Sequence, residues 1–161
     1  MQILADHTLV VKTKYPARIT QTIPDSEVVL NYGDGRYEVA VKWNLQAARV
    51  LSQYMKNVPS PIKRDYKWPR PMGYEPFDHQ RETSSFLSLR KRAFCFNEQG
   101  TGKTASVIWA ADYLINAGLI KRVLIVCPLS IMQSAWQNDL FKFATHRRVD
   151  IAYRSEEHTS E

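Results

Sequence analysis

The chain has 161 residues, of which 44% are hydrophobic, and its formal net charge is +6. This hydrophobic content can bury a core, which excludes wholesale disorder, and no apolar run in the sequence approaches the roughly 20 residues that span a bilayer. The basic excess suits a polyanionic partner, although it specifies none. The first residues lack a basic stretch followed by an apolar one, so they do not form a secretory signal and no membrane partner is expected.

Residues 1–57 are predicted to form a small β-rich α+β accessory module. Two alternating apolar runs flank Asp34-Gly35, a dipeptide typical of tight hairpin turns. An apolar stripe at three- to four-residue spacing follows Asn44, which predicts a helix over residues 45–57 with Asn44 as its N-cap. A sheet of two or three strands with one helix is small, so we expect it to dock on a neighbour.

Residues 58–76 have the composition of an extended linker, because they hold five of the eight prolines. Basic side chains alternate there with aromatic ones, namely Lys63, Arg64, Lys67 and Arg70 with Tyr66, Trp68 and Tyr74. We favour a connector whose aromatic side chains pack on the neighbouring domain. A grip on a nucleic acid strand is the alternative.

Residues 77–153 show the alternation of an α/β fold. Two short apolar runs, 93–96 and 123–126, resemble strands buried on both faces. A helix over residues 79–90 is predicted before the first run, with Phe86 facing inward. A second is predicted over residues 103–117, with Gly118 at its end and an apolar stripe made of Val107, Ala111, Leu114 and Ile115. A third follows the second run, and Ser130 and Gln133 have the spacing of a capping box at its start. Strand, helix, strand, helix predicts a right-handed parallel sheet. Cys95 lies within the first run and Cys127 directly follows the second, so we expect buried free thiols and an intracellular, cytoplasmic location.

The last eight residues, 154–161, read as the in-frame translation of a common sequencing adapter. We therefore expect them to be an artefact, and we expect the natural chain to continue beyond Tyr153.

A glycine loop precedes the predicted helix at residue 103, and its sequence ends Gly102-Lys103-Thr104. Glycines allow the backbone to fold round an anion, and the amides at a helix N-terminus attract phosphate. Lys103 can reach the terminal phosphates and the Thr104 hydroxyl can bind Mg²⁺. Asn97 stands where the usual P-loop has its first glycine, which argues against small GTPases and nucleotide kinases.

Residues 97–104 resemble motif I of superfamily 2 helicases, most closely that of the Swi/Snf branch of DNA translocases. Residues 76–87 resemble the family's Q-motif region, and residues 122–143 resemble its motif Ia. The layout before them resembles the accessory module of annealing helicases and of some phage helicases. The resemblance implies a partial RecA-like P-loop lobe with a parallel sheet over residues 77–153.

The resemblance also implies site residues and ligands. ATP and Mg²⁺ would be the cofactors, Lys103 and Thr104 the catalytic residues, and Thr104 the metal ligand. Nucleotide contacts would come from Gln80, which would recognise adenine, and from the loop residues Glu98, Gln99, Gly100, Thr101, Gly102, Lys103, Thr104 and Ala105. Contacts to the DNA backbone would come from Pro128, Leu129 and Ser130.

The expected function is therefore that of a fragment of an ATP-dependent DNA helicase or translocase acting on double-stranded or forked DNA. Hydrolysis requires an Asp-Glu pair and an arginine finger. Neither is recognisable before Tyr153, so we do not expect this chain to turn over ATP alone. The alternatives are a non-catalytic DNA-binding module with a relic P-loop and a lobe of an RNA helicase.

Overall fold

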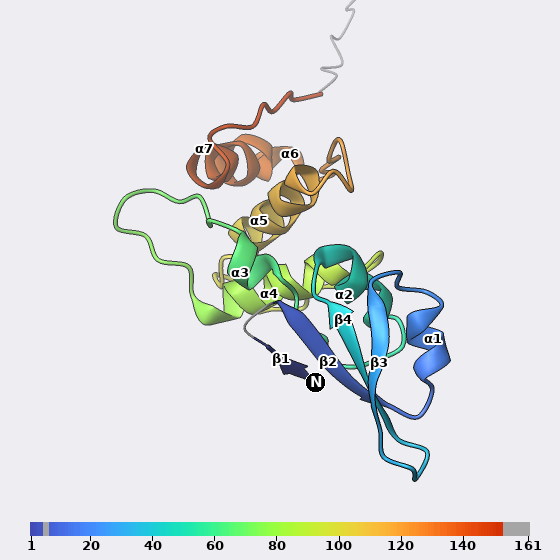
Figure 1. Cartoon of the computed structure of the whole chain (residues 1–161). Helices are drawn as coiled ribbons and strands as arrows, with labels where there is room; N and C mark the ends of the chain where they lie inside the picture. Colours follow the sequence, from blue (N-terminus) through green and yellow to red (C-terminus); the bar gives the residue numbers. More distant parts are fainter. Residues whose placement is uncertain (5–6, 153–161) are drawn as a thin grey trace, which may run out of the picture.

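The structure of the protein is a computed structural model that describes residues 1–4 and 7–152. A small sheet at one end of the molecule is followed by a helical region at the other (Figure 1). The expected adapter-derived tail at 154–161 lies outside the described residues. Among the described helices, none has the length and apolar character needed to cross a bilayer.

The sheet has four antiparallel strands in the order β1-β2-β4-β3. Its strands are β1 (Gln2–Ile3), β2 (Thr8–Thr13), β3 (Ser26–Asn31) and β4 (Tyr37–Lys42). The predicted hairpin is confirmed, since β3 and β4 pair across the Asp34-Gly35 turn. Leu9 and Val11 of β2 and Val39 and Val41 of β4 are fully buried at alternating positions, so one face of the sheet carries the core.

Three short helices accompany the sheet: α1 (Pro16–Thr20), α2 (Leu45–Leu51) and α3 (Ile62–Asp65). The N-cap prediction is confirmed, because the Asn44 side chain accepts a hydrogen bond from the Ala47 amide at 2.9 Å. The helix itself ends earlier than predicted, at Leu51. Helix α1 was not predicted from the sequence, and it starts with a proline in its first position.

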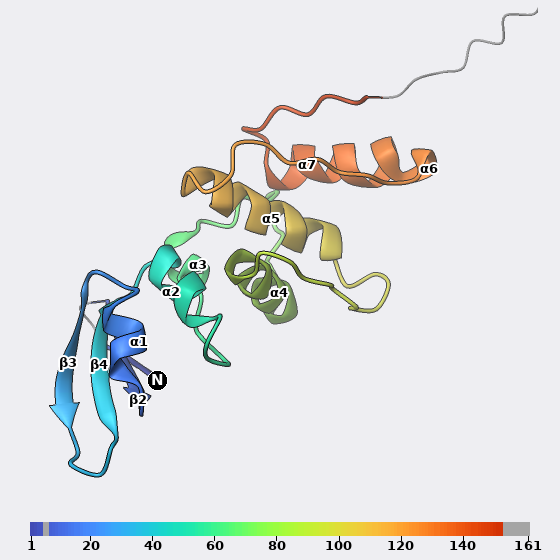
Figure 2. The same ribbon diagram turned by 90° about the vertical axis from the view of Figure 1, so that its right-hand side faces the viewer.

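The helical region contains α4 (Asp78–Leu89), α5 (Lys103–Asn116), α6 (Leu129–Ile131), a π-helical segment η1 (Met132–Gln137) and α7 (Asn138–Phe143). Helices α4 and α5 lie side by side and run in the same direction. Gln80 lies beside Gly102, and the Ser84 hydroxyl donates to the Ser106 carbonyl at 2.9 Å. Figure 2 shows α7 on the other side of α5.

The predicted parallel sheet is wrong. The only sheet among the described residues is the antiparallel one, and the two apolar runs that should have formed parallel strands are unpaired. Their large side chains are exposed: Phe94 by 82%, Phe96 by 88%, Leu124 by 88% and Val126 by 87%. A buried parallel strand needs hydrogen-bonded neighbours and helices over both faces, and no described segment supplies either. A RecA-like lobe is therefore not what the structure shows.

Related predictions about burial fail for the same reason. Cys95 and Cys127 are free but only partly buried. Phe86 is 44% exposed, although it was expected to face inward from α4. The predicted bounds of α5 are correct to within one residue, and Gly118 follows it with a φ of 72°. However, α5 buries a different stripe from the predicted one, centred on Ile108 and Trp109.

Aromatic side chains fasten the connector to the helical region, as predicted. Trp68 lies 5.5 Å from Trp109 of α5 between ring centroids, and Tyr66 lies 5.8 Å from Tyr113, both edge to face. Tyr74 approaches Phe143 of α7 at 5.2 Å. The Trp109 indole N–H also donates to the Pro69 carbonyl at 2.8 Å. We call Tyr66, Trp68, Tyr74, Trp109, Tyr113 and Phe143 the aromatic cluster.

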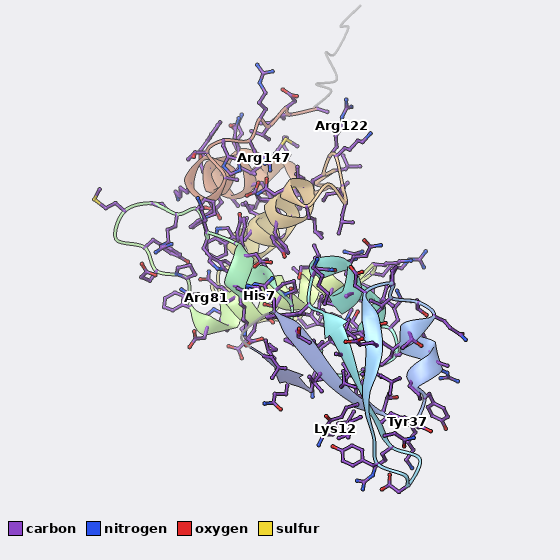
Figure 3. The ribbon with its side chains drawn as sticks, in the orientation of Figure 1. His7, Lys12, Tyr37, Arg81, Arg122 and Arg147 are labelled. Carbon is purple, nitrogen blue, oxygen red and sulfur yellow. The ribbon has the colours of Figure 1, made fainter. Side chains whose placement is uncertain are left out.

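A buried carboxylate, Asp112 of α5, lies beside this cluster. It accepts hydrogen bonds from the Tyr66 hydroxyl at 2.6 Å and from Arg147 Nε at 2.5 Å, and His146 Nε2 lies 2.8 Å away. Figure 3 shows Arg147 beside α7. Burial alone would raise the pKa of Asp112, but the hydrogen bonds from Tyr66, Arg147 and His146 outweigh it and hold that pKa below its ordinary value.

Candidate nucleotide-binding loop

The glycine loop ends at the first residue of α5, and its backbone conformation requires glycine. Gly100 has a φ of 77° and Gly102 a φ of 69°, both in the left-handed region. At Gly102 a side chain would also lack space, because an added Cβ would lie 2.1 Å from Gln80 Nε2. The two glycines therefore shape the turn that delivers the chain into α5.

Lys103 folds back over this loop. Its ammonium donates to the carbonyl oxygens of Asn97 at 2.8 Å and Glu98 at 2.6 Å. The Thr101 hydroxyl also donates to the Glu98 carbonyl, at 2.8 Å. The cation thus lies inside the turn that its own backbone forms, where an anion held by the loop amides would meet it.

Asn97, at the position of the missing first glycine, has a structural contact of its own. Its side-chain amide donates to the Thr83 hydroxyl of α4 at 2.9 Å. His79 Nε2 lies 2.9 Å from the Thr101 carbonyl. These two contacts hold both halves of the loop against α4, and no motif in the sequence indicates either of them.

Gln80, the predicted adenine ligand, is 1% exposed and lies under the loop. Its Oε1 accepts from the Phe77 amide at 2.9 Å, and its Nε2 donates to the Tyr74 hydroxyl at 2.9 Å and to the Gly102 carbonyl at 3.3 Å. Both ends of the amide are thus already paired within the protein. In this structure Gln80 stabilises the Gly102 turn through the hydrogen bond to the Gly102 carbonyl.

The other predicted ligands lie at or near the loop. Glu98 and Gln99 are exposed, Thr104 is partly buried in the first turn of α5, and Ala105 is buried in the core. Ala105 can therefore offer a ligand only its backbone amide. No group of three or more metal-binding side chains occurs among the described residues, so a magnesium ion here would depend on Thr104 and on phosphate oxygens.

A hollow of about 350 Å³ adjoins the loop, between the outer face of α4 and residues 94–97. Its lining includes Phe86, Phe94, Phe96 and Asn97. This hollow was not predicted from the sequence, because residues 93–96 were expected to form a buried strand and Phe86 to face the core.

The predicted DNA contacts, Pro128, Leu129 and Ser130, are all exposed at the start of α6. The expected capping box is wrong: Pro128 is the N-cap and no side chain caps the helix. The Ser130 carbonyl instead accepts from the Ser134 hydroxyl at 3.0 Å. In Figure 2 this segment and the start of α5 lie toward the same side of the molecule.

Comparisons with known proteins add one partial similarity. The chain is 31% identical over 84 residues to the DNA excision repair protein ERCC-6-like of Mus musculus, and the match covers 49% of this chain and 7% of that protein. No family model matches the chain, and no solved structure matches it. The chain therefore shares a short stretch with a DNA repair protein, which is weak support for an origin among helicase-type proteins.

Proposed function

We propose that this chain carries the nucleotide-binding part of an ATP-dependent DNA helicase or translocase. The observation that supports the proposal best is the loop itself, in which two left-handed glycines lead into a lysine at the start of a 14-residue helix. Such a helix start attracts phosphate through its free amides and its dipole. ATP with Mg²⁺ is the proposed ligand.

Binding would reorganise the loop only slightly. The Lys103 ammonium would exchange the Asn97 and Glu98 carbonyls for phosphate oxygens, which are stronger partners because they carry full charge. Thr104 would place its hydroxyl on the metal, and the Gly100–Thr104 amides would surround the phosphates. Gln80 would keep the turn at Gly102 in place, because it bonds the Gly102 carbonyl.

DNA is the proposed partner. The partial similarity to a DNA excision repair protein supports it, and so does the net charge of +6. The exposed residues Pro128, Leu129 and Ser130 are the proposed contacts to its backbone, on the strength of the motif Ia resemblance.

The test is binding of a fluorescent ATP analogue to the whole chain in the presence of Mg²⁺. Lys103→Ala should weaken binding by about tenfold or more, because it removes the charge that meets the terminal phosphates. Lys67→Ala, which removes an exposed lysine outside the loop, should leave binding unchanged. Absence of binding by the wild-type chain, or equal binding by the Lys103→Ala variant, would contradict the proposal.

A further inference from the structure

An open hollow of about 470 Å³ lies between α2 and the end of α4, far along α4 from the glycine loop. Four cationic side chains line it: Arg49, Arg90, Lys91 and Arg92. The rest of its lining is Ser52, Gln53 and Leu89, so the lining contains no carboxylate. We call the hollow that these four residues line the basic hollow.

Two of the four cations are held in place by reciprocal contacts between the helices. Arg49 of α2 donates to the Ser88 carbonyl near the end of α4 at 2.9 Å. Arg90, just after α4, donates to the Ser52 carbonyl just after α2 at 3.3 Å. Each contact occupies only part of a guanidinium, so N–H groups remain free on both arginines.

The C-terminal ends of helices attract cations, which explains Arg49 and Arg90 but not the other two. Lys91 and Arg92 are exposed, and within the part of the chain that the structure describes neither has an ion pair or a side-chain hydrogen bond. Indeed none of the four cations has a carboxylate partner among the described residues. Four unpaired positive charges round one hollow repel each other, so an anion placed there is stabilised.

We propose that the basic hollow binds the phosphate backbone of DNA. Guanidinium groups match phosphate oxygens in pairs, and an open hollow suits a polymer better than an enclosed small molecule. The choice of DNA rests on the proposed function. The basic hollow would be a second DNA-contacting surface, at the end of the helical region that lies nearest the sheet.

This surface is separate from the nucleotide loop. Helix α4 has 12 residues and is therefore about 18 Å long. Gln80 near its start touches the glycine loop, whereas the basic hollow lies at its end. One nucleotide cannot occupy both places, so binding at each can be measured independently.

The experiment measures the binding of fluorescently labelled duplex DNA to the whole chain at several salt concentrations. The test variant is Lys91→Ala with Arg92→Ala, which leaves the two helix-bound arginines untouched. Its matched control is Lys121→Ala with Arg122→Ala, since this Lys-Arg pair is also exposed and also precedes an apolar run but does not line the hollow. In Figure 3, Arg122 lies on the opposite side of α5 from the sheet.

The test variant should bind DNA about tenfold more weakly, and its salt dependence should fall by about two phosphate contacts. The control should lose markedly less affinity. Equal losses for the two pairs would overturn the proposal, because net charge alone would explain them. Unchanged DNA binding by the test variant would also overturn the proposal. So would binding of polyglutamate at the hollow with the same affinity as DNA.

Binding of the ATP analogue separates this inference from the proposed function. The Lys91→Ala, Arg92→Ala variant should retain wild-type nucleotide affinity. If the wild-type chain binds the analogue but not DNA, the hollow assignment fails and the nucleotide loop stands. If it binds DNA through the hollow but not the analogue, the reverse holds.

Discussion

The aromatic cluster and the two apolar runs, 93–96 and 123–126, both consist of large, mostly apolar side chains, but the cluster is buried and the runs are exposed. Trp109 is fully buried and Phe143 is 6% exposed, whereas Phe96 and Leu124 are each 88% exposed. The cluster takes its members from the connector, α5 and α7, and they enclose one another. Each apolar run is a single segment that pairs with no strand in residues 1–4 and 7–152. Hydrophobic composition thus becomes burial only where other segments supply the covering surface.

The largest effect should come from removing a member of the aromatic cluster. Phe143→Ala should lower the free energy of unfolding by about 3–5 kcal/mol, because it leaves a cavity beside Tyr74 and Trp109. Urea denaturation measures this directly. Phe141→Ala, two residues earlier on α7 and 54% exposed, is the matched control and should change little. Equal losses for the two variants would remove the distinction between the buried and exposed sets.

An intermediate effect is expected at Asp112, which fastens the connector beside the cluster. Asp112→Asn should cost about 2 kcal/mol at about pH 7, because it weakens charged hydrogen bonds from Tyr66 and Arg147. The pKa of Asp112 is lower in the folded chain than in the unfolded one. Its stabilising contribution is therefore complete above the unfolded value of about 3.9 and is lost as the pH falls through the folded value.

Unfolding free energies measured from neutral to acidic pH test this. The difference between wild type and the Asp112→Asn variant should shrink below about pH 4. Asp150→Asn, at an exposed position, should follow the wild type throughout. A difference that stayed constant with pH would show that the carboxylate charge does not matter.

The smallest effect should occur in the exposed runs. Phe96→Ala should change the free energy of unfolding by no more than about 0.5 kcal/mol, since the ring is 88% exposed and, within the described part of the chain, only the Phe94 ring stacks on it. The same urea titration measures it. A loss similar to that of Phe143→Ala would mean that the first apolar run is covered in solution. The run and the aromatic cluster would then not differ in burial.

Local signals in the sequence predicted local structure well. The Asp34-Gly35 hairpin, the Asn44 cap and the bounds of α5 each depend on backbone preferences within a few residues. The need for glycine at positions 100 and 102 was foreseen for the same reason.

Features that depend on distant segments were not predictable in this way. The buried face of α5 is set by α4, α7 and the connector, so the apolar pattern of α5 alone indicated the wrong stripe. The parallel sheet failed because an apolar run does not reveal whether a strand will pair with it. The pairing of Gln80 with Gly102 required knowing that α4 and α5 run side by side.

Helix α4 has a mechanical consequence, because it touches both proposed binding surfaces. Its Gln80 holds the carbonyl of Gly102, and its Ser88 carbonyl receives Arg49 from α2. A helix bonded along its length moves as a rod, so its two ends cannot shift independently. If Gln80 moved when the loop changes shape, Ser88 and its partner Arg49 would therefore move as well. Through α4, even a slight change in the shape of the loop would therefore be accompanied by a slight movement of α2 and of the sheet that precedes it.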